Sequence, residues 1–144
     1  VQLLNDRDWR IRPERYKTPI QVEIYIAKRE FQYALSALRN ISPDDEHLVG
    51  LKKKVYLRWA RSAPSVIDAK RIAEEGLSVP LDTALRRNIP IMVTSARLAL
   101  LAGDAPQFEG LLGEISELNA EVARLLRNEE EGEIVYWEEG AFES

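Results

Sequence analysis

The stretch LALLAGDAPQFEGLL, residues 98–112, decides how this chain folds, because it ends one helix and begins another. Glycine is the residue type that most often follows the end of a helix, and Gly103 comes directly after an apolar helix-forming run. Asp104 and Pro106 are typical of the first turn of the next helix. From Phe108 onward, apolar residues recur at spacings of three and four. The stretch therefore predicts two helices joined by a tight turn.

Two upstream segments repeat this pattern. Turns are expected at residues 27–31 and 61–65, and each is followed by an apolar stripe. The corresponding positions in the three second helices are Ala34, Ala69 and Phe108, which lie 35 and 39 residues apart. Self-similarity near this period is typical of stacked helical hairpins, in which no hairpin can bury its apolar face alone.

The pattern resembles the tetratricopeptide repeat superfamily. Residues 98–104, followed by Phe108, are similar to the end of a repeat's first helix, its Gly-Asp turn and the start of its second helix. Residues 30–38 are similar to the turn and second helix of another unit, with Arg29 in place of the turn glycine. The resemblance covers roughly residues 20–125. It implies a concave surface that accepts a peptide or helix from another protein.

We therefore expect an all-α fold in which antiparallel helical hairpins stack as a short right-handed solenoid or bundle over residues 19–127. An extended basic and aromatic arm is expected at residues 1–18, and an acidic aromatic tail at residues 128–144. Thr18 and Pro19 mark the start of the first helix as its cap and first residue. Glu129 and its neighbours are expected to form a linker after the last helix.

Local signals define the helices between these limits. The repeat register favours a turn at residues 28–30, but this segment contains no Gly, Pro or Asn, so we expect one continuous helix over residues 19–39. The further expected helices run from Pro43 to about Arg61, from Ser65 to a C-terminal cap at Gly76, near 81–88, over 90–102 and over 106–127.

Charge is distributed unevenly along the 144 residues, which carry a net charge of −4. Residues 1–62 hold 13 Lys and Arg against 8 Asp and Glu, whereas residues 63–144 hold 7 against 16. Such asymmetry bears on partners and orientation rather than on fold. The absence of cysteine fits a reducing compartment, so a cytoplasmic location is expected, and no apolar run is long enough to span a bilayer.

Catalysis finds little support in the sequence. The single histidine, His47, lies in the first turn of a predicted helix beside three acidic residues, where a surface role is expected, and no second histidine exists for a metal site. No P-loop, GxGxxG, HExxH or GxSxG motif is present. We therefore predict a protein that is not an enzyme and has no catalytic residues, cofactor or metal site.

The leading hypothesis is a protein–protein interaction module with an adaptor, assembly or chaperone-like role. Aromatic and basic side chains of the helices and the tail are the predicted partner contacts: Tyr25, Tyr33, Lys54, Tyr56, Arg58, Trp59, Arg61, Arg97, Tyr136, Trp137 and Phe142. The acidic tail has three alternatives. It folds back as a cap, docks on the basic half of the same chain or a second copy, or anchors to a different protein.

Nucleic-acid binding is the alternative hypothesis. Basic residues with interleaved aromatics can follow phosphates and stack on bases, and the residues concerned are Arg7, Trp9, Arg10, Arg12, Arg15, Lys17, Lys52 and Lys53. The isoelectric point of about 5.2 argues against this role, because an acidic chain repels a polyanion. Trp9 and Tyr16 could equally pack the arm against the helical body.

Overall fold

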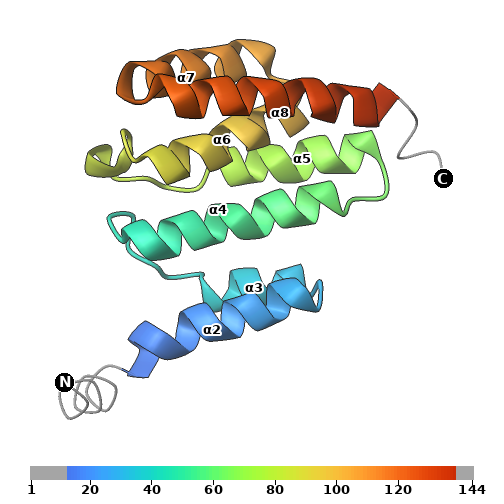
Figure 1. The fold of residues 1–144 in the computed structure, drawn as a ribbon. Coiled ribbons are helices and arrows are strands. Elements are labelled where there is room, and N and C mark those ends of the chain that lie inside the picture. The colour runs from blue at the N-terminus through green and yellow to red at the C-terminus, as the bar shows by residue number, and fades with distance from the viewer. Residues whose placement is uncertain (1–12, 139–144) are drawn as a thin grey trace.

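The computed structural model describes residues 13–138 of the chain and, within them, the side chains of residues 17–130. Over this range the fold is all-α, as predicted, with seven helices and no strand (Figure 1). The elements are α2 (Pro13–Ala27), α3 (Phe31–Ala37), α4 (Glu46–Arg61), α5 (Val66–Leu77), the 3₁₀ turn η1 (Thr83–Leu85), α6 (Ile89–Leu101), α7 (Ala105–Leu118) and α8 (Ala120–Glu138). None of these helices is long and apolar enough to cross a membrane.

The helices pack mainly against their near neighbours along the chain. Three pairs are in contact, α2 with α3, α4 with α5 and α6 with α7, and α8 covers α7. In addition, α4 contacts both α2 and α6, and α6 also contacts α8. Figure 1 shows the result, with α2 and α3 at one end of the molecule and α7 and α8 at the other.

The register positions that defined the sequence repeat are all in the core. Ala34 and Ala69 are fully buried, and Phe108 is 2% exposed. Each packs with its own group of apolar side chains between neighbouring helices. This part of the sequence prediction is confirmed.

The continuous helix expected over residues 19–39 is wrong, because α2 ends at Ala27 and α3 begins at Phe31. Helix propensity differs by only a few tenths of a kcal/mol between most residue types. Turning the chain here lets Phe31 and Ala34 pack against α2 in a common core with Val22. The core therefore outweighs the local preference for continuity.

The turn at Arg29 has the same backbone form as the turn at Gly103. Both residues lie in the left-handed region, with φ of 59° and 72°. The amide after Arg29 donates to the carbonyl of Tyr25 at 2.8 Å, and the amide after Gly103 donates to the carbonyl of Ala99 at 3.0 Å. These six-residue hydrogen-bonded loops are the Schellman ending of a helix. The first turn thus follows the repeat register even though it lacks glycine.

The predicted start of the first helix is also wrong. Helix α2 begins at Pro13, and Pro19 lies inside it. Pro13 carries the same first-turn signal that was assigned to Pro19, because proline suits the first residue of any helix. Of the predicted extended arm, residues 13–18 are therefore helical, and residues 1–12 lie outside the described part of the chain.

At the other end, the single helix expected over residues 106–127 is two helices. Asn119 is extended, with φ −160° and ψ 98°, and it ends α7. Its side-chain oxygen then accepts the amide of Val122 at 3.2 Å, which caps α8. Helix α8 continues to Glu138, so the expected acidic linker is helical, and residues 139–144 lie outside the described range.

Two further boundaries differ from the prediction. Helix α4 starts at Glu46, not Pro43, because the side chain of Asp45 accepts the amide of Leu48 at 3.0 Å and caps the helix there. The helix expected near 81–88 is only the short turn η1, and the amide of Asp82 before it donates to the carbonyl of Pro43 at 2.9 Å.

Gly76 was expected to cap the C-terminus of its helix, but it lies inside α5 and is buried. A Cβ added at this position would lie 2.7 Å from the Cβ of Tyr56 on α4. It would also lie 3.0 Å from both methyl carbons of Leu98 on α6. Glycine is therefore required here because three helices approach one another closely, not because the chain turns.

Candidate partner-binding groove

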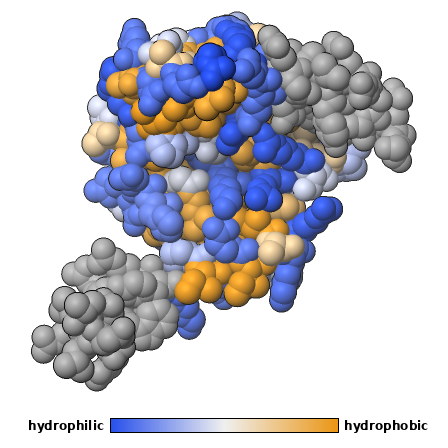
Figure 2. All heavy atoms as spheres, viewed as in Figure 1, coloured by the Kyte–Doolittle hydropathy of each residue, from blue (hydrophilic) through white to orange (hydrophobic). Residues whose placement is uncertain are grey.

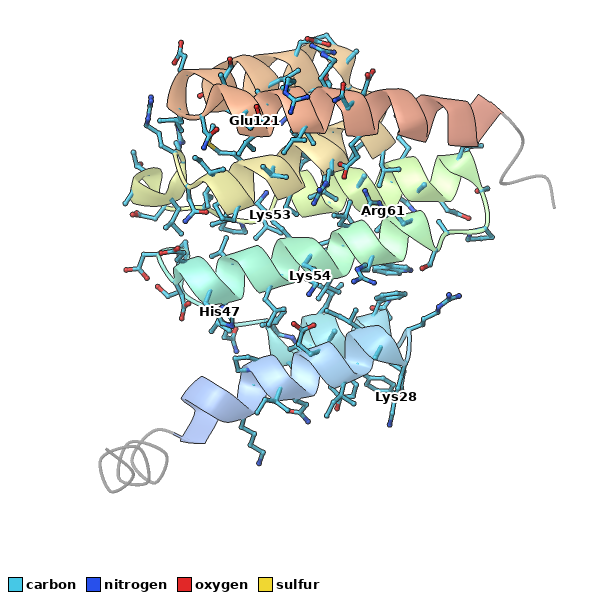
Figure 3. All side chains as sticks on the ribbon, in the orientation of Figure 1. Lys28, His47, Lys53, Lys54, Arg61 and Glu121 are labelled. Atoms are coloured by element: carbon cyan, nitrogen blue, oxygen red, sulfur yellow. The ribbon has the colours of Figure 1, made fainter. Side chains whose placement is uncertain are left out.

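Helices α2, α4 and α6 together line a groove of about 670 Å³. Helix α4 runs along its length and contributes residues from both ends, including His47 and Arg61, which Figure 3 labels near the start and the end of α4. At 1.5 Å per residue, the 16 residues of α4 extend for about 24 Å. The groove therefore has the length of a short peptide segment.

The charges in the groove are separated along α4. Asp45 and Glu46 lie at its N-terminal end, whereas Arg58 and Arg61 lie at its C-terminal end. Arg97 of α6 lines the same groove. The distribution also complements the dipole of α4, because acids favour a helix N-terminus and bases a C-terminus. The groove thus presents an acidic end and a basic end.

Apolar side chains form the floor between these ends. Leu51 and Leu57 from α4 and Ile91 from α6 line the groove and are at most 6% exposed. Gly50 adds a stretch of bare backbone, and a Cβ built on it would lie 3.8 Å from Cγ1 of Ile91. A ligand in the groove would therefore contact apolar surface as well as charge.

Two of the groove cations already bind carboxylates of the same chain. Lys54 Nζ lies 3.3 Å from both carboxylate oxygens of Glu23 on α2. Arg97 donates from Nε and Nη2 to the two oxygens of Glu129 on α8, at 2.6 and 2.9 Å. All four side chains are between 34% and 53% exposed, so these pairs contribute little to stability. Within the described residues, Arg58 has no such partner.

Of the predicted partner contacts, the structure brings the four basic residues together in the groove: Lys54, Arg58, Arg61 and Arg97. Glu23 and Glu129, which pair with two of them, were not predicted. They lie 31 and 32 residues from their partners, and no local spacing indicates such a contact. His47 is exposed, as expected, and lines the acidic end.

The four predicted aromatic contacts on the helices do not line this groove. Trp59 is half-buried, and its ring stacks on Phe31 at 6.1 Å and on Tyr56 at 6.5 Å between centroids. The rings of Tyr25 and Tyr33 lie 5.7 Å apart on the first hairpin. These aromatic side chains mainly hold helices together, although Tyr33 is 61% exposed. The side chains of Tyr136 and Trp137, and all of Phe142, lie outside the described residues.

Among the predicted nucleic-acid contacts, Lys53 is wrong. Its side chain is 2% exposed, and its Nζ donates to the backbone carbonyl of Gly76 at 3.1 Å. Burial lowers the pKa of Lys53 to about 8. A lysine held inside the protein cannot bind a phosphate at the surface. Lys52 is half-exposed on α4 and Lys17 is exposed on α2.

The other residues predicted to contact nucleic acid are all near the N-terminus. The structure does not describe Arg7, Trp9, Arg10, Arg12 or the side chain of Arg15.

In the part that is described, no three His, Asp or Glu side chains come together as metal ligands would.

Comparisons of the whole chain with protein-family models, with curated proteins and with solved structures found no match. The seven packed helices are compatible with a helical repeat fold. The function proposed next therefore rests on the residues of the groove.

Proposed function

We propose that this chain is a non-enzymatic protein-binding module, with an adaptor, assembly or chaperone-like role, that accepts a segment of another protein between α2, α4 and α6. The observation that carries the proposal is the groove of about 670 Å³, with an apolar floor and cations from two helices. Concave sites of this kind, apolar with a few convergent polar groups, are typical of binding sites.

We further propose that the helices form a short right-handed stack of hairpins similar to tetratricopeptide repeats. The contacts between successive hairpins support this arrangement, as does the shared backbone form of the turns at Arg29 and Gly103. In such a stack the first helices of the hairpins lie side by side and leave a continuous surface for a partner. Helices α2, α4 and α6 hold that position here.

The chemistry of the groove favours a partner segment that carries carboxylates and apolar side chains. Arginine binds carboxylates through two parallel hydrogen bonds, and Arg97 already does so with Glu129. A partner carboxylate could exchange with Glu23 or Glu129 at little cost, because both pairs are partly exposed. Arg58 offers a further cation, and the floor beneath takes apolar side chains.

The first experiment selects binders from displayed random peptides of about 16 residues, which as a helix match the length of α4. The full chain is the bait. We expect enrichment of Asp and Glu together with apolar residues. Binding of selected peptides is then measured by fluorescence anisotropy, and Arg58→Glu should weaken it by about tenfold. Lys70→Glu makes the same charge change on α5, outside the groove, and should leave binding within about twofold.

The proposal fails if no peptide is enriched, or if the groove and control variants weaken binding equally. A single-stranded oligonucleotide in the same assay tests the alternative hypothesis. Binding of the oligonucleotide, with an affinity that falls steeply with added salt, would favour a nucleic-acid role instead.

A further inference from the structure

The 131–144 segment of this chain has the composition that the groove favours in a partner. It contains five Glu and no Lys or Arg. Between these glutamates lies an apolar and aromatic cluster, residues 134–137. Ile134, Trp137 and Ala141 recur at spacings of three and four, which are typical of the apolar face of a helix. The segment therefore offers carboxylates for the groove cations and apolar side chains for the groove floor.

The basic half of the groove retains a cation for a further carboxylate. Lys54, Arg58 and Arg61 follow one another along one face of α4, and Arg97 joins them from α6. Arg58 makes no ion pair with the described residues, and the pairs that Lys54 and Arg97 make are partly exposed. Figure 2 shows apolar residues between hydrophilic ones across the middle of the molecule. An acidic and apolar segment complements this half of the groove and is repelled by its acidic end.

Helix α8 holds the segment away from the groove of its own chain. Arg97 binds Glu129, and α8 continues unbroken from there to Glu138. At 1.5 Å per residue, Glu138 lies about 14 Å beyond that contact along the helix. Figure 1 shows α4 and α8 running in the same direction, with α8 ending beyond the end of α4. The backbone of residues 134–137 therefore lies past the basic end of the groove, too far along α8 to reach the apolar floor of the same chain.

We propose that the 131–144 segment of one copy of this chain binds the basic half of the groove in a second copy. This inference rests on the proposed function and names the partner of the groove. Residues 131–139 hold four glutamates around the apolar cluster. As a helix they extend for about 13 Å, close to the length of about 12 Å that residues 54–61 of α4 provide. The cluster then covers the floor at Leu57, and the glutamates bind Arg58 and its basic neighbours.

Each copy carries one groove and one such segment, so the contact joins two different surfaces. A contact of this kind leaves one groove and one segment free, and it extends into open chains of copies unless the rotation closes a ring. A segment of this length buries less surface than a stable dimer needs. We therefore expect weak association, with a dissociation constant on the order of 100 µM. Added salt should weaken it further, because the charges involved are partly exposed.

Sedimentation velocity of the full chain from about 10 µM to about 1 mM tests the proposal. The average mass should rise with concentration above the monomer value of 16.5 kDa. Arg58→Glu disables the groove and Trp137→Glu disables the segment, so each variant alone should remain a monomer. An equimolar mixture of the two retains one intact groove and one intact segment and should form a dimer that does not grow further.

Lys70→Glu is the matched control, because it makes the charge change of Arg58→Glu on α5, outside the groove. It should associate like the unmodified chain. Circular dichroism checks that every variant keeps its helices, and Phe142→Glu replaces Trp137→Glu if that variant unfolds. The proposal is overturned if the unmodified chain stays monomeric throughout, if Arg58→Glu alone still associates, or if the mixture remains monomeric.

The peptides selected on the full chain separate this failure from failure of the proposed function. If the chain stays monomeric but Arg58→Glu still weakens binding of those peptides, the groove binds a different partner and only the present inference is lost. A monomeric chain whose Trp137→Glu variant binds the peptides more tightly than the unmodified chain would place the segment in its own groove, which also overturns the inference.

Discussion

Lys53 Nζ and the carbonyl oxygen of Gly76 lie 3.1 Å apart, and this hydrogen bond joins α4 to α5 inside the protein. Gly76 is also the residue whose missing Cβ lets these helices meet. The buried amine of Lys53 and the close approach of the α4 and α5 backbones therefore occur at the same place in the core. Each of the two residues leads to a prediction about stability.

Stability should rise with pH between about 8 and 10.5 because of Lys53. Burial lowers its pKa from 10.5 to about 8, so the folded protein loses this proton at a lower pH than the unfolded chain does. The unfolded state then binds more protons within that window, and the free energy of unfolding increases as pH rises through it. At 1.36 kcal/mol per pKa unit, the upper limit of the increase is about 3 kcal/mol.

Urea unfolding at pH 7, 8, 9 and 10 measures this effect when the unmodified chain is compared with Lys53→Met. The variant should lack the rise and should be at least as stable at pH 7, because a buried unpaired charge is replaced by an apolar chain. The carbonyl of Gly76 still accepts the amide of Val79, at 3.4 Å, in the variant. Tyr56, whose pKa burial raises, is present in both proteins, so its contribution cancels. A difference that does not change with pH would contradict the assignment.

Gly76→Ala should destabilise the protein by about 2–3 kcal/mol, although alanine favours a helix by about 1 kcal/mol. The added methyl would lie 2.7 Å from the Cβ of Tyr56, which cannot move without α4. Gly110→Ala on α7 is the matched control, because nothing lies within 4 Å of its Cβ position. Chemical denaturation should show a loss for the first variant and a small gain for the second.

Arg29→Gly should stabilise the protein by about 1 kcal/mol, because only glycine adopts a positive φ without steric cost. Gly103→Ala, at the turn with the same hydrogen-bond pattern, should destabilise it by a similar amount. Thermal unfolding of the two variants checks both signs. Equal shifts in the same direction would show that the two turns are not equivalent.

Glu129→Gln should tighten binding of selected acidic peptides by about threefold, because Arg97 would lose its competing carboxylate. Glu121→Gln removes a similar pair, with Arg124, on the same helix but outside the groove. Fluorescence anisotropy should show the gain only for Glu129→Gln. Weaker binding of that variant would indicate that Glu129 positions Arg97 for the partner rather than competing with it.

The helix-turn-helix pattern was predictable wherever the chain carries a strong stop signal. Gly103 marked its turn from the sequence alone. Arg29 occupies an equivalent turn without any local signal, because there the packing of Phe31 and Ala34 against α2 decides the backbone. Asn119 carried an unused signal, since asparagine suits a helix cap, but the apolar spacing of three and four continued across it.

The basic side of the groove was predictable because Lys54, Arg58 and Arg61 recur at spacings that share one face of α4. Their carboxylate partners were not, since these come from helices that are distant in the sequence. Lys53 sits in a run of three lysines that point about 100° apart, and packing of α4 against α5 buries the middle one. The sequence alone does not tell which of the three lysines faces inward, because that depends on which helices pack against α4.

The main helix contacts join elements that are adjacent or next but one along the chain. Contacts of short sequence separation form early, since little chain entropy is lost before they are made. The described part of this protein should therefore fold within milliseconds or faster. During synthesis, α2 and α3 therefore need α4 to complete the core that the three helices share, and they can pack with it before α7 and α8 have been made.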